Sequence, residues 1–204
     1  MIETISVFAH EQEKYAKLWQ DVPAYRNVSF GEQLVGPFLA LSKIQPGQTL
    51  VDVGCGVGRA SLTFARLGIN VRAVDLDRRA LDLEVAQAVS VHSTHGEFSF
   101  IEACLWQRRW THATYPFDWA YCCDVLEHIP TEFTMLVVER CLQAASRSFL
   151  HINFDPDHFG QTIGEPLHLT VQPFTWWRDR LADLASVTDA RDLLGHGFFV
   201  LENR

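Results

Sequence analysis

The sequence has no long apolar segment. Its 204 residues are 48% hydrophobic and 21% charged, and no apolar run approaches the roughly 20 residues that a membrane-spanning helix needs. The first stretch, Met1 to Lys14, carries acidic residues where a signal peptide would have an apolar core. These absences predict a soluble cytoplasmic protein whose length fits one compact domain.

Basic residues and paired cysteines are also scarce. The chain has 17 lysines and arginines against 25 aspartates and glutamates, a formal net charge of −8, which disfavours binding to nucleic-acid backbones or anionic lipid. Its 5 cysteines include no CxxC pair of the kind that holds zinc or runs redox chemistry. We therefore expect reduced thiols, no membrane partner and no nucleic-acid partner.

Repeats and low-complexity linkers are absent too, and what remains is an alternation of short apolar runs with stretches of helical period. That alternation is typical of parallel sheets built through βαβ crossovers, so the predicted fold class is α/β. The predicted strands lie at 49–53, 70–75, 98–103, 117–123 and 148–154. The helices between them are predicted at 58–67, 78–91 and 131–145.

Both ends of the chain extend this core pattern. The tail is predicted to contain a helix at 174–184 and two strands, 187–191 and 197–201, which should pair antiparallel across a short Gly-His-Gly turn. Before the first strand, residues 8–41 show helical periodicity. We therefore divide the chain into an N-terminal helical extension and cofactor lid, 1–45, and a main domain, 46–204.

The most informative segment runs from Val51 to Arg59, where a predicted strand enters a glycine loop that opens a helix. Glycines permit positive φ and close approach of a ligand, and the free N–H groups at a helix start favour an anionic group. A dinucleotide fingerprint would need its third glycine at the position of Arg59, so NAD and FAD are disfavoured. A Walker lysine is also missing, which argues against a triphosphate cradle.

The end of the next predicted strand carries Asp75, 21 residues after Gly54. A carboxylate at this place in a doubly wound sheet lies beside the glycine loop and can accept both hydroxyls of a ribose. Loop and acid together predict a nucleoside ligand with an anionic tail and no obligatory pyrophosphate. The alternatives are local: Asp75 could cap the next helix, and Asp52 could cap the turn.

The pattern D-x-G-x-G-x-G, followed by an acid that ends the next strand, resembles the S-adenosylmethionine site of class I methyltransferases. In that family the glycine loop takes the methionine end of the cofactor, the acid binds the ribose, and the end of the third strand contacts adenine. The resemblance implies a Rossmann-like, doubly wound, seven-stranded sheet whose last strand is antiparallel. It assigns cofactor binding in this chain to Asp52, Gly54, Cys55, Gly56, Gly58, Asp75, Leu76, Cys104, Leu105, Asp124 and Val125.

The N-terminal extension contributes further candidates for the same site. In the resembled family such an extension folds over the cofactor, which adds Trp19, Tyr25 and Arg26 to the predicted cofactor contacts. The Trp19 ring would attract the sulfonium, and Tyr25 or Arg26 would meet the methionine carboxylate. Core packing is the alternative for Trp19, because it is the more common use of tryptophan.

The fourth predicted strand ends in Asp124-Val-Leu-Glu127-His128. This resembles the D-x-x-E-H stretch of small-molecule class I methyltransferases such as the ubiquinone-pathway O-methyltransferases, and it belongs at the mouth of the site. His128 is a predicted general base, with packing inside the loop as the alternative. Related E-x-x-E-H sequences can bind magnesium, but the first acid here is one methylene shorter, so a divalent metal is not favoured.

The loop from Asp155 to Val171 is long for a compact domain, and such loops are usually functional. Its segment Gly164-Glu165-Pro-Leu-His168-Leu also resembles uncharacterised phage-borne methyltransferase-like proteins, a resemblance that implies no substrate. Glu165 and His168 are predicted to bind substrate or act as a base. A solvated Glu165 and a packing His168 are the alternatives.

The resulting hypothesis is an S-adenosylmethionine-dependent methyltransferase that acts on an O or N atom of a small or medium-sized acceptor. One alternative is a noncatalytic protein that binds S-adenosylmethionine or another nucleoside. The other is an RNA- or DNA-modifying methyltransferase, which the net charge disfavours.

Overall fold

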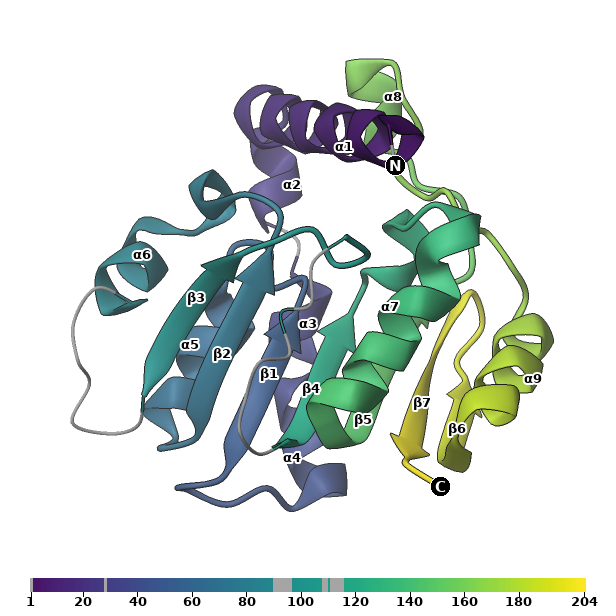
Figure 1. Ribbon diagram of the computed structural model, residues 1–204. Coiled ribbons are helices and arrows are strands. Elements are labelled where there is room, and N and C mark those ends of the chain that lie inside the picture. Colours follow the sequence, from purple (N-terminus) through teal and green to yellow (C-terminus); the bar gives the residue numbers. More distant parts are fainter. Residues whose placement is uncertain (1, 28, 90–96, 108–109, 111–115) are drawn as a thin grey trace.

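One seven-stranded sheet forms the centre of the computed structural model, which describes residues 2–27, 29–89, 97–107, 110 and 116–204 (Figure 1). The strand order is β3-β2-β1-β4-β5-β7-β6, with β7 antiparallel to both of its neighbours and the other pairs parallel. The predicted doubly wound sheet with an antiparallel last strand is confirmed. The strands are β1 (Thr49–Val53), β2 (Asn70–Asp75), β3 (Phe98–Glu102), β4 (Phe117–Cys123), β5 (Ala145–Asn153), β6 (Ser186–Asp192) and β7 (His196–Glu202).

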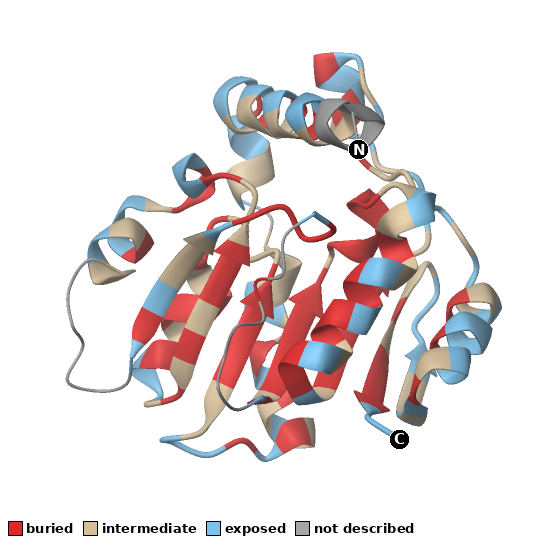
Figure 2. Cartoon of the chain, in the orientation of Figure 1, coloured by how far each residue is buried: buried red, intermediate tan, exposed pale blue. Residues whose placement is uncertain are grey.

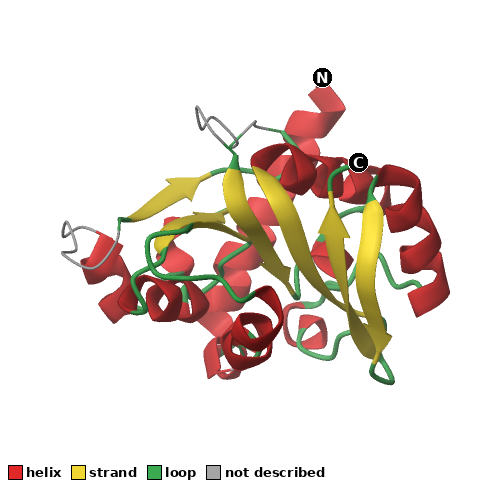
Figure 3. Ribbon diagram, turned by 90° about the horizontal axis from the view of Figure 1, so that it is seen from below, coloured by secondary structure: helices red, strands yellow, loops and turns green. Residues whose placement is uncertain are grey.

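Helices cover both faces of this sheet (Figures 1 and 3). One face carries α4 (Val35–Ser42), α5 (Arg59–Arg66) and α6 (Leu83–Val89), and the other carries α7 (Thr131–Ala144) and α9 (Phe174–Leu184). Strands covered on both sides must be apolar along their whole length, and the central strands are buried almost throughout (Figure 2). The result is a three-layer sandwich.

Phe38 of α4 is the centre of the packing on one face. Its ring lies within 5.5 Å, centroid to centroid, of four other rings, those of Phe64, Trp119, Tyr121 and Phe149. Edge-to-face contacts of this kind add to the burial of apolar area. The last helix of the N-terminal extension is therefore part of the body of the protein.

The first helix of the extension lies elsewhere. The extension contains α1 (Ile2–Asp21), α2 (Pro23–Asn27) and α3 (Phe30–Gln33) before α4. Helix α1 crosses above the carboxyl edge of the sheet, beside the one-turn helix α8 (Gly160–Ile163) (Figure 1). Its Leu18 belongs to a small separate cluster with Val22, Ile163 and Leu167, whereas its Val7 and Phe8 pack against the main core. None of the described helices is long and apolar enough to cross a membrane.

Most predicted elements are confirmed at their bounds or within a few residues, and one helix is wrong. The helix predicted at 78–91 is broken: a 3₁₀ turn, η1 (Arg78–Ala80), precedes α6, and residues 90–91 lie outside the described part. The backbone turns extended at Leu81, with φ −57° and ψ 136°. Strand β5 begins at Ala145, earlier than predicted, because Ala145 pairs with Phe117 directly after α7 ends.

Candidate active site

A cavity of about 290 Å³ opens at the carboxyl ends of β1, β2, β4 and β5. Helix α1 contributes Glu11, Tyr15 and Trp19 to its lining, and the loop after β5 contributes Asp157 and His168. In open α/β sheets ligands bind at this edge, where the strand order reverses. The reversal falls here between β1 and β4.

The glycine loop forms the floor of one end of the cavity. Gly54 and Gly56 line it with φ of 75° and 53°, values that favour glycine. A Cβ at Gly54 would lie 2.5 Å from Cγ2 of Val125, so the loop and the segment after β4 touch there. Gly58 lies outside the lining. A Cβ at Gly58 would lie 2.6 Å from Cγ1 of Val85 in α6, so only glycine leaves room for that side chain. Cys55 lines the cavity between the first two glycines.

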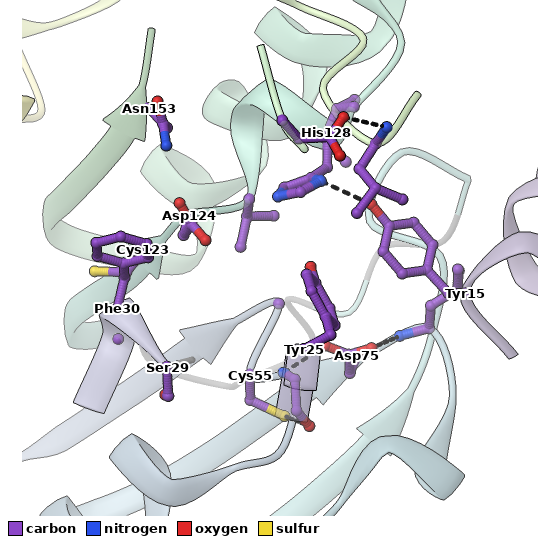
Figure 4. Close-up of a pocket in the computed structure, with 18 of the residues that line it drawn as sticks. Tyr15, Tyr25, Ser29, Phe30, Cys55, Asp75, Cys123, Asp124, His128 and Asn153 are labelled. Carbon is purple, nitrogen blue, oxygen red and sulfur yellow. Dashed lines mark hydrogen bonds between the residues drawn. The ribbon is translucent and has the colours of Figure 1, made fainter. Parts of the chain in front are cut away.

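Asp75 ties the end of β2 to this loop. Its Oδ2 accepts the backbone N–H of Gly56 at 2.7 Å, and its Oδ1 accepts that of Leu76 at 2.7 Å. Burial raises the pKa of Asp75, while these backbone hydrogen bonds lower it. Each carboxylate oxygen can accept a further hydrogen bond, so Asp75 can hold the loop and receive ribose hydroxyls together (Figure 4).

Asp52 lies deeper in the same lining. It is buried, and its Oδ2 accepts a 2.5 Å hydrogen bond from the hydroxyl of Ser61 in α5. Burial raises the pKa of Asp52 to about 7, against the opposing effect of the Ser61 hydrogen bond. Asp52 thus joins the loop to α5, and its carboxyl is charged in only about half of the molecules near neutral pH.

Of the residues predicted to contact adenine, some line the cavity and one is buried in the core. Leu76 and Leu105 line the cavity, as does Trp106, whereas Cys104 is buried outside the lining. Burial raises the pKa of the Cys104 thiol. This end of the cavity is therefore apolar, as a purine ring requires.

Of the three residues predicted from the N-terminal extension, two line the cavity and one does not. Trp19 and Tyr25 line the cavity with their ring centroids 4.9 Å apart. Arg26 lies outside the lining: it donates to the carbonyls of Ala80 at 2.9 Å and Arg79 at 3.0 Å, and it stacks over Trp19 at 5.3 Å. Its guanidinium therefore holds η1 and Trp19, away from the place predicted for a ligand carboxylate.

Asp124 begins the other end of the cavity, directly after β4. It has a φ of 60°, a strained conformation for a residue with a side chain. Its backbone N–H donates to the carbonyl of His151 at 3.0 Å, and the side chain lines the cavity (Figure 4). Its Oδ1 is buried, and the side chain shares a hydrogen bond with that of Glu127.

Glu127 turns away from the cavity, although the sequence placed it at the mouth. Its Oε1 accepts the backbone N–H of Asn153 at 2.7 Å, and its carbonyl accepts those of Leu169 at 2.7 Å and Thr170 at 2.9 Å. It is fully buried. Burial and the neighbouring Asp124 raise the pKa of Glu127 well above its ordinary value. Glu127 is thus a neutral anchor for the loop after β5.

His128 and His168 meet inside the lining. Their ring centroids lie 4.7 Å apart, edge to face. Nδ1 of His128 lies 2.9 Å from the hydroxyl of Tyr15, and its Nε2 is buried without a partner among the described residues. Burial, with His168 and Lys14 nearby, lowers the pKa of His128 to about 3. His128 is therefore neutral near pH 7.

Glu165 does not reach the cavity. Its carboxylate pairs with Nε2 of His10 at 2.8 Å on the outer side of α1. Among the described residues, one group has metal-ligand spacing: Glu127, His128 and His168, whose ligand atoms lie within 4.8 Å of one another. This set contains His168 in place of the Asp124 of the D-x-x-E-H stretch, for which the sequence did not favour a metal.

Several lining residues, among them Glu11 and Tyr15, were not predicted. Both precede the predicted Trp19 at intervals of four residues, so the same helix face could have been extended to Glu11. Phe30 and Asn153 also line the cavity. Neither residue has a local sequence signal, because each reaches the site through the arrangement of the chain in space.

A family model described as a methyltransferase domain matches residues 50–147. Magnesium-protoporphyrin O-methyltransferase of Synechocystis sp. is 28% identical over 118 residues, 58% of this chain and 49% of that protein. A ubiquinone biosynthesis O-methyltransferase of Cupriavidus pinatubonensis is 37% identical over 84 residues, 41% of this chain and 32% of that protein. The matched segment thus spans about half or less of these curated relatives.

Solved structures share the fold over nearly the whole chain. Synechocystis magnesium protoporphyrin IX methyltransferase with bound SAH has a TM-score of 0.62 at 22% identity, covering 94% of this chain and 93% of that one. The 1,6-didemethyltoxoflavin-N1-methyltransferase of Burkholderia thailandensis, with 1,6-didemethyltoxoflavin and S-adenosylhomocysteine bound, has a TM-score of 0.73 at 15% identity, covering 98% and 89%. The shared sheet shows that this chain has the fold of these methyltransferases, and residues 50–147 are similar to the methyltransferase-domain family model.

Proposed function

We propose that this protein binds S-adenosylmethionine in the cavity and transfers its methyl group to a small or medium-sized acceptor. The observation that carries the proposal is the Asp75 carboxylate, which lines the cavity while bonded to Gly56 of the glycine loop. Its remaining acceptor capacity suits the two hydroxyls of a ribose. Gly56 keeps the space beside it open, because a Cβ there would meet only Trp19, at 3.8 Å.

The chain's own residues would hold the cofactor along the cavity. Asp75 would take the ribose, Leu76 and Leu105 the adenine, and the loop at Gly54 the methionine end. When bound, S-adenosylmethionine supplies a methyl group on a positively charged sulfur, ready for in-line displacement. The Trp19 and Tyr25 rings beside the loop would favour that positive charge through their faces.

The two histidines would take different parts in the proton transfer. Nδ1 of His168 lies at hydrogen-bond distance from the carbonyl of Asp155. A carbonyl can only accept, so Nδ1 carries the hydrogen and Nε2 of a neutral His168 is free to take a proton. His168 is therefore the better placed base, and chelators should leave the activity unchanged because no step needs a metal.

Calorimetric titration with S-adenosylmethionine tests the proposal. Asp75→Asn removes the charge that would receive the ribose, so we expect affinity to fall about 10- to 100-fold relative to wild type. Asp179→Asn, an exposed aspartate on α9, is the matched control and should bind as wild type does. Equal affinity in wild type and Asp75→Asn would remove the ribose role.

Turnover requires a second measurement. Release of S-adenosylhomocysteine from the wild type in the presence of an acceptor pool would establish transfer. A protein that binds the cofactor and releases none of this product with any acceptor would be a noncatalytic binder instead.

A further inference from the structure

The lining of the cavity is acidic. Asp75, Asp124 and Asp157 line it without an ion pair to lysine or arginine, and no lysine or arginine belongs to the lining within the described part of the chain. Glu11 also lines the cavity, but Lys14 neutralises it at 2.6 Å. A wall with charges of one sign attracts neutral or positive ligands and repels anions.

Asp124 places one of these charges beside Glu127. Oδ1 of Asp124 and Oε2 of Glu127 are both buried, and the two carboxyl groups share a hydrogen bond when one of them holds a proton. The pKa of each carboxyl is raised by burial, and that of Glu127 is raised well above its ordinary value. A proton held by this pair therefore sits on Glu127 and leaves the charge on Asp124.

The surroundings of Asp124 fit a flat ligand that has a hydrogen to donate. The ring of Phe30 lies on the same side of the cavity as Asp124 and Cys123, and the rings of Tyr25 and His128 face the same space (Figure 4). Nε2 of His128, a residue only 9% exposed, is a buried polar atom without a partner among the described residues. Aromatic walls with a few convergent polar groups are typical of small-molecule sites.

We propose that the methyl acceptor is a nitrogen atom of a neutral aromatic or heterocyclic amine. This inference rests on the proposed methyl transfer and names the acceptor of that same site. The nitrogen lone pair forms the new N–CH₃ bond while the S–CH₃ bond breaks and its electron pair stays on sulfur. Positive charge thereby moves from sulfur to nitrogen, and the N–H proton then leaves for Nε2 of His168 and from there for water.

The acidic lining favours this charge movement. Asp124 stabilises the positive charge as it develops on nitrogen, which is where preorganised charge accelerates a reaction. A phenolate or carboxylate acceptor would instead have to bring its negative charge next to Asp75 and Asp124 before transfer. The same lining therefore disfavours anionic oxygen as the acceptor.

Three probes that share one ring system test the inference: 6-aminoquinoline, 6-hydroxyquinoline and quinoline-6-carboxylate. Each is titrated into the protein saturated with S-adenosylhomocysteine. We expect the amine to bind at least about tenfold more tightly than the carboxylate, with the hydroxyl compound between them. In Asp124→Asn this ratio should shrink several-fold, since asparagine keeps the shape, tolerates the positive φ and loses the charge. Asp179→Asn should keep the wild-type ratio.

The outcomes separate this inference from the proposed function. Failure of S-adenosylhomocysteine to bind overturns the function itself. If S-adenosylhomocysteine binds, three results overturn only the choice of acceptor: a carboxylate that binds as well as the amine, a ratio unchanged by Asp124→Asn, or no saturable binding of any probe. The absence of saturable binding overturns the choice of acceptor because a cavity that selects the amine has to bind it.

Discussion

At the scale of single residues, hydrogen bonds decide which imidazole can accept a proton. The phenol of Tyr15 keeps its proton, because burial raises its pKa well above the ordinary value. His128 is its hydrogen-bond partner within the described residues, so the phenol donates to Nδ1 and the proton of neutral His128 stays on Nε2. His128 is then a donor toward the cavity, which supports the proposed role of His168 as the base. The sequence had left the base open among His128, Glu165 and His168.

Substitution of His168 separates catalysis from binding. His168→Gln removes the free imidazole nitrogen, so we expect kcat to fall about 100-fold or more, in the range of general-base effects. The dissociation constant for S-adenosylmethionine should change little, because the residues proposed to hold the cofactor lie at the other end of the cavity. Single-turnover kinetics combined with calorimetry measure the two quantities.

The control for this substitution is His10→Gln. His10 lies on α1 outside the lining and pairs with Glu165, so its loss should leave kcat within a few-fold of wild type. A similar kcat in His168→Gln and wild type would return the role of base to His128 or to solvent.

Asp52 gives the stability of the protein a pH dependence. Its pKa rises from 3.8 to about 7 on folding because it is buried. A raised pKa means that the folded state binds the proton more tightly, so this stabilisation is present below pH 3.8 and is lost as the pH rises to about 7. Asp52→Asn cannot titrate. The variant should therefore gain stability relative to wild type across this window, by roughly 2 to 4 kcal/mol.

Urea unfolding of both proteins at a series of pH values measures this difference. The amide oxygen introduced by Asp52→Asn can still accept the hydrogen bond that Ser61 donates to Asp52, so the local structure has a matched replacement. A difference in the free energy of unfolding that stays constant from pH 3.8 to 7 would show that Asp52 is not the group that titrates.

At the scale of elements, continuous apolar runs made the strands predictable, and a distant contact made one helix unpredictable. Strands β1, β2 and β4 begin and end as predicted, because both of their faces are covered and the sequence shows it. The helix predicted at 78–91 has a suitable apolar period. The helix is interrupted where the guanidinium of Arg26 donates hydrogen bonds to the backbone carbonyls of Arg79 and Ala80. Those carbonyls belong to residues more than 50 positions from Arg26, so no local pattern contains the information.

The same limit applies to the side chains of the site. The glycine pattern and Asp75 were identified from spacing alone, because parallel strands bring their carboxyl ends together. The positive φ of Asp124 and the orientation of Glu127 away from the cavity depend on contacts with His151, Asn153 and the loop after β5. Glu165 was chosen from its neighbours in sequence, but its partner is His10, 155 positions earlier.

At the scale of the whole molecule, α1 is attached to the body through two separate sets of apolar contacts. Leu18 belongs to a small cluster apart from the two large ones on the sheet faces, and Val7 and Phe8, which are only partly buried, pack against one of the large ones. Two lysines of α1 also donate hydrogen bonds to backbone carbonyls of the segment that follows β5. Nζ of Lys14 lies 3.4 Å from the carbonyl oxygen of Pro166, and Nζ of Lys17 lies 3.3 Å from that of Ile163. We propose that α1 and α8 form the moving part of the predicted lid, while α4 belongs to the body.

A pair of identical substitutions tests this division, because Leu18 of α1 and Leu150 of β5 both have 0% of their surface exposed. Leu150→Ala leaves a cavity in the main core and should cost about 2 to 5 kcal/mol of global stability. Leu18→Ala should lower the melting temperature far less, because opening α1 is a local event. It should instead weaken S-adenosylhomocysteine binding several-fold and speed hydrogen exchange in α1 alone. Equal losses of melting temperature in the two variants would make α1 part of the same cooperative unit as the sheet, and the lid would have to be abandoned.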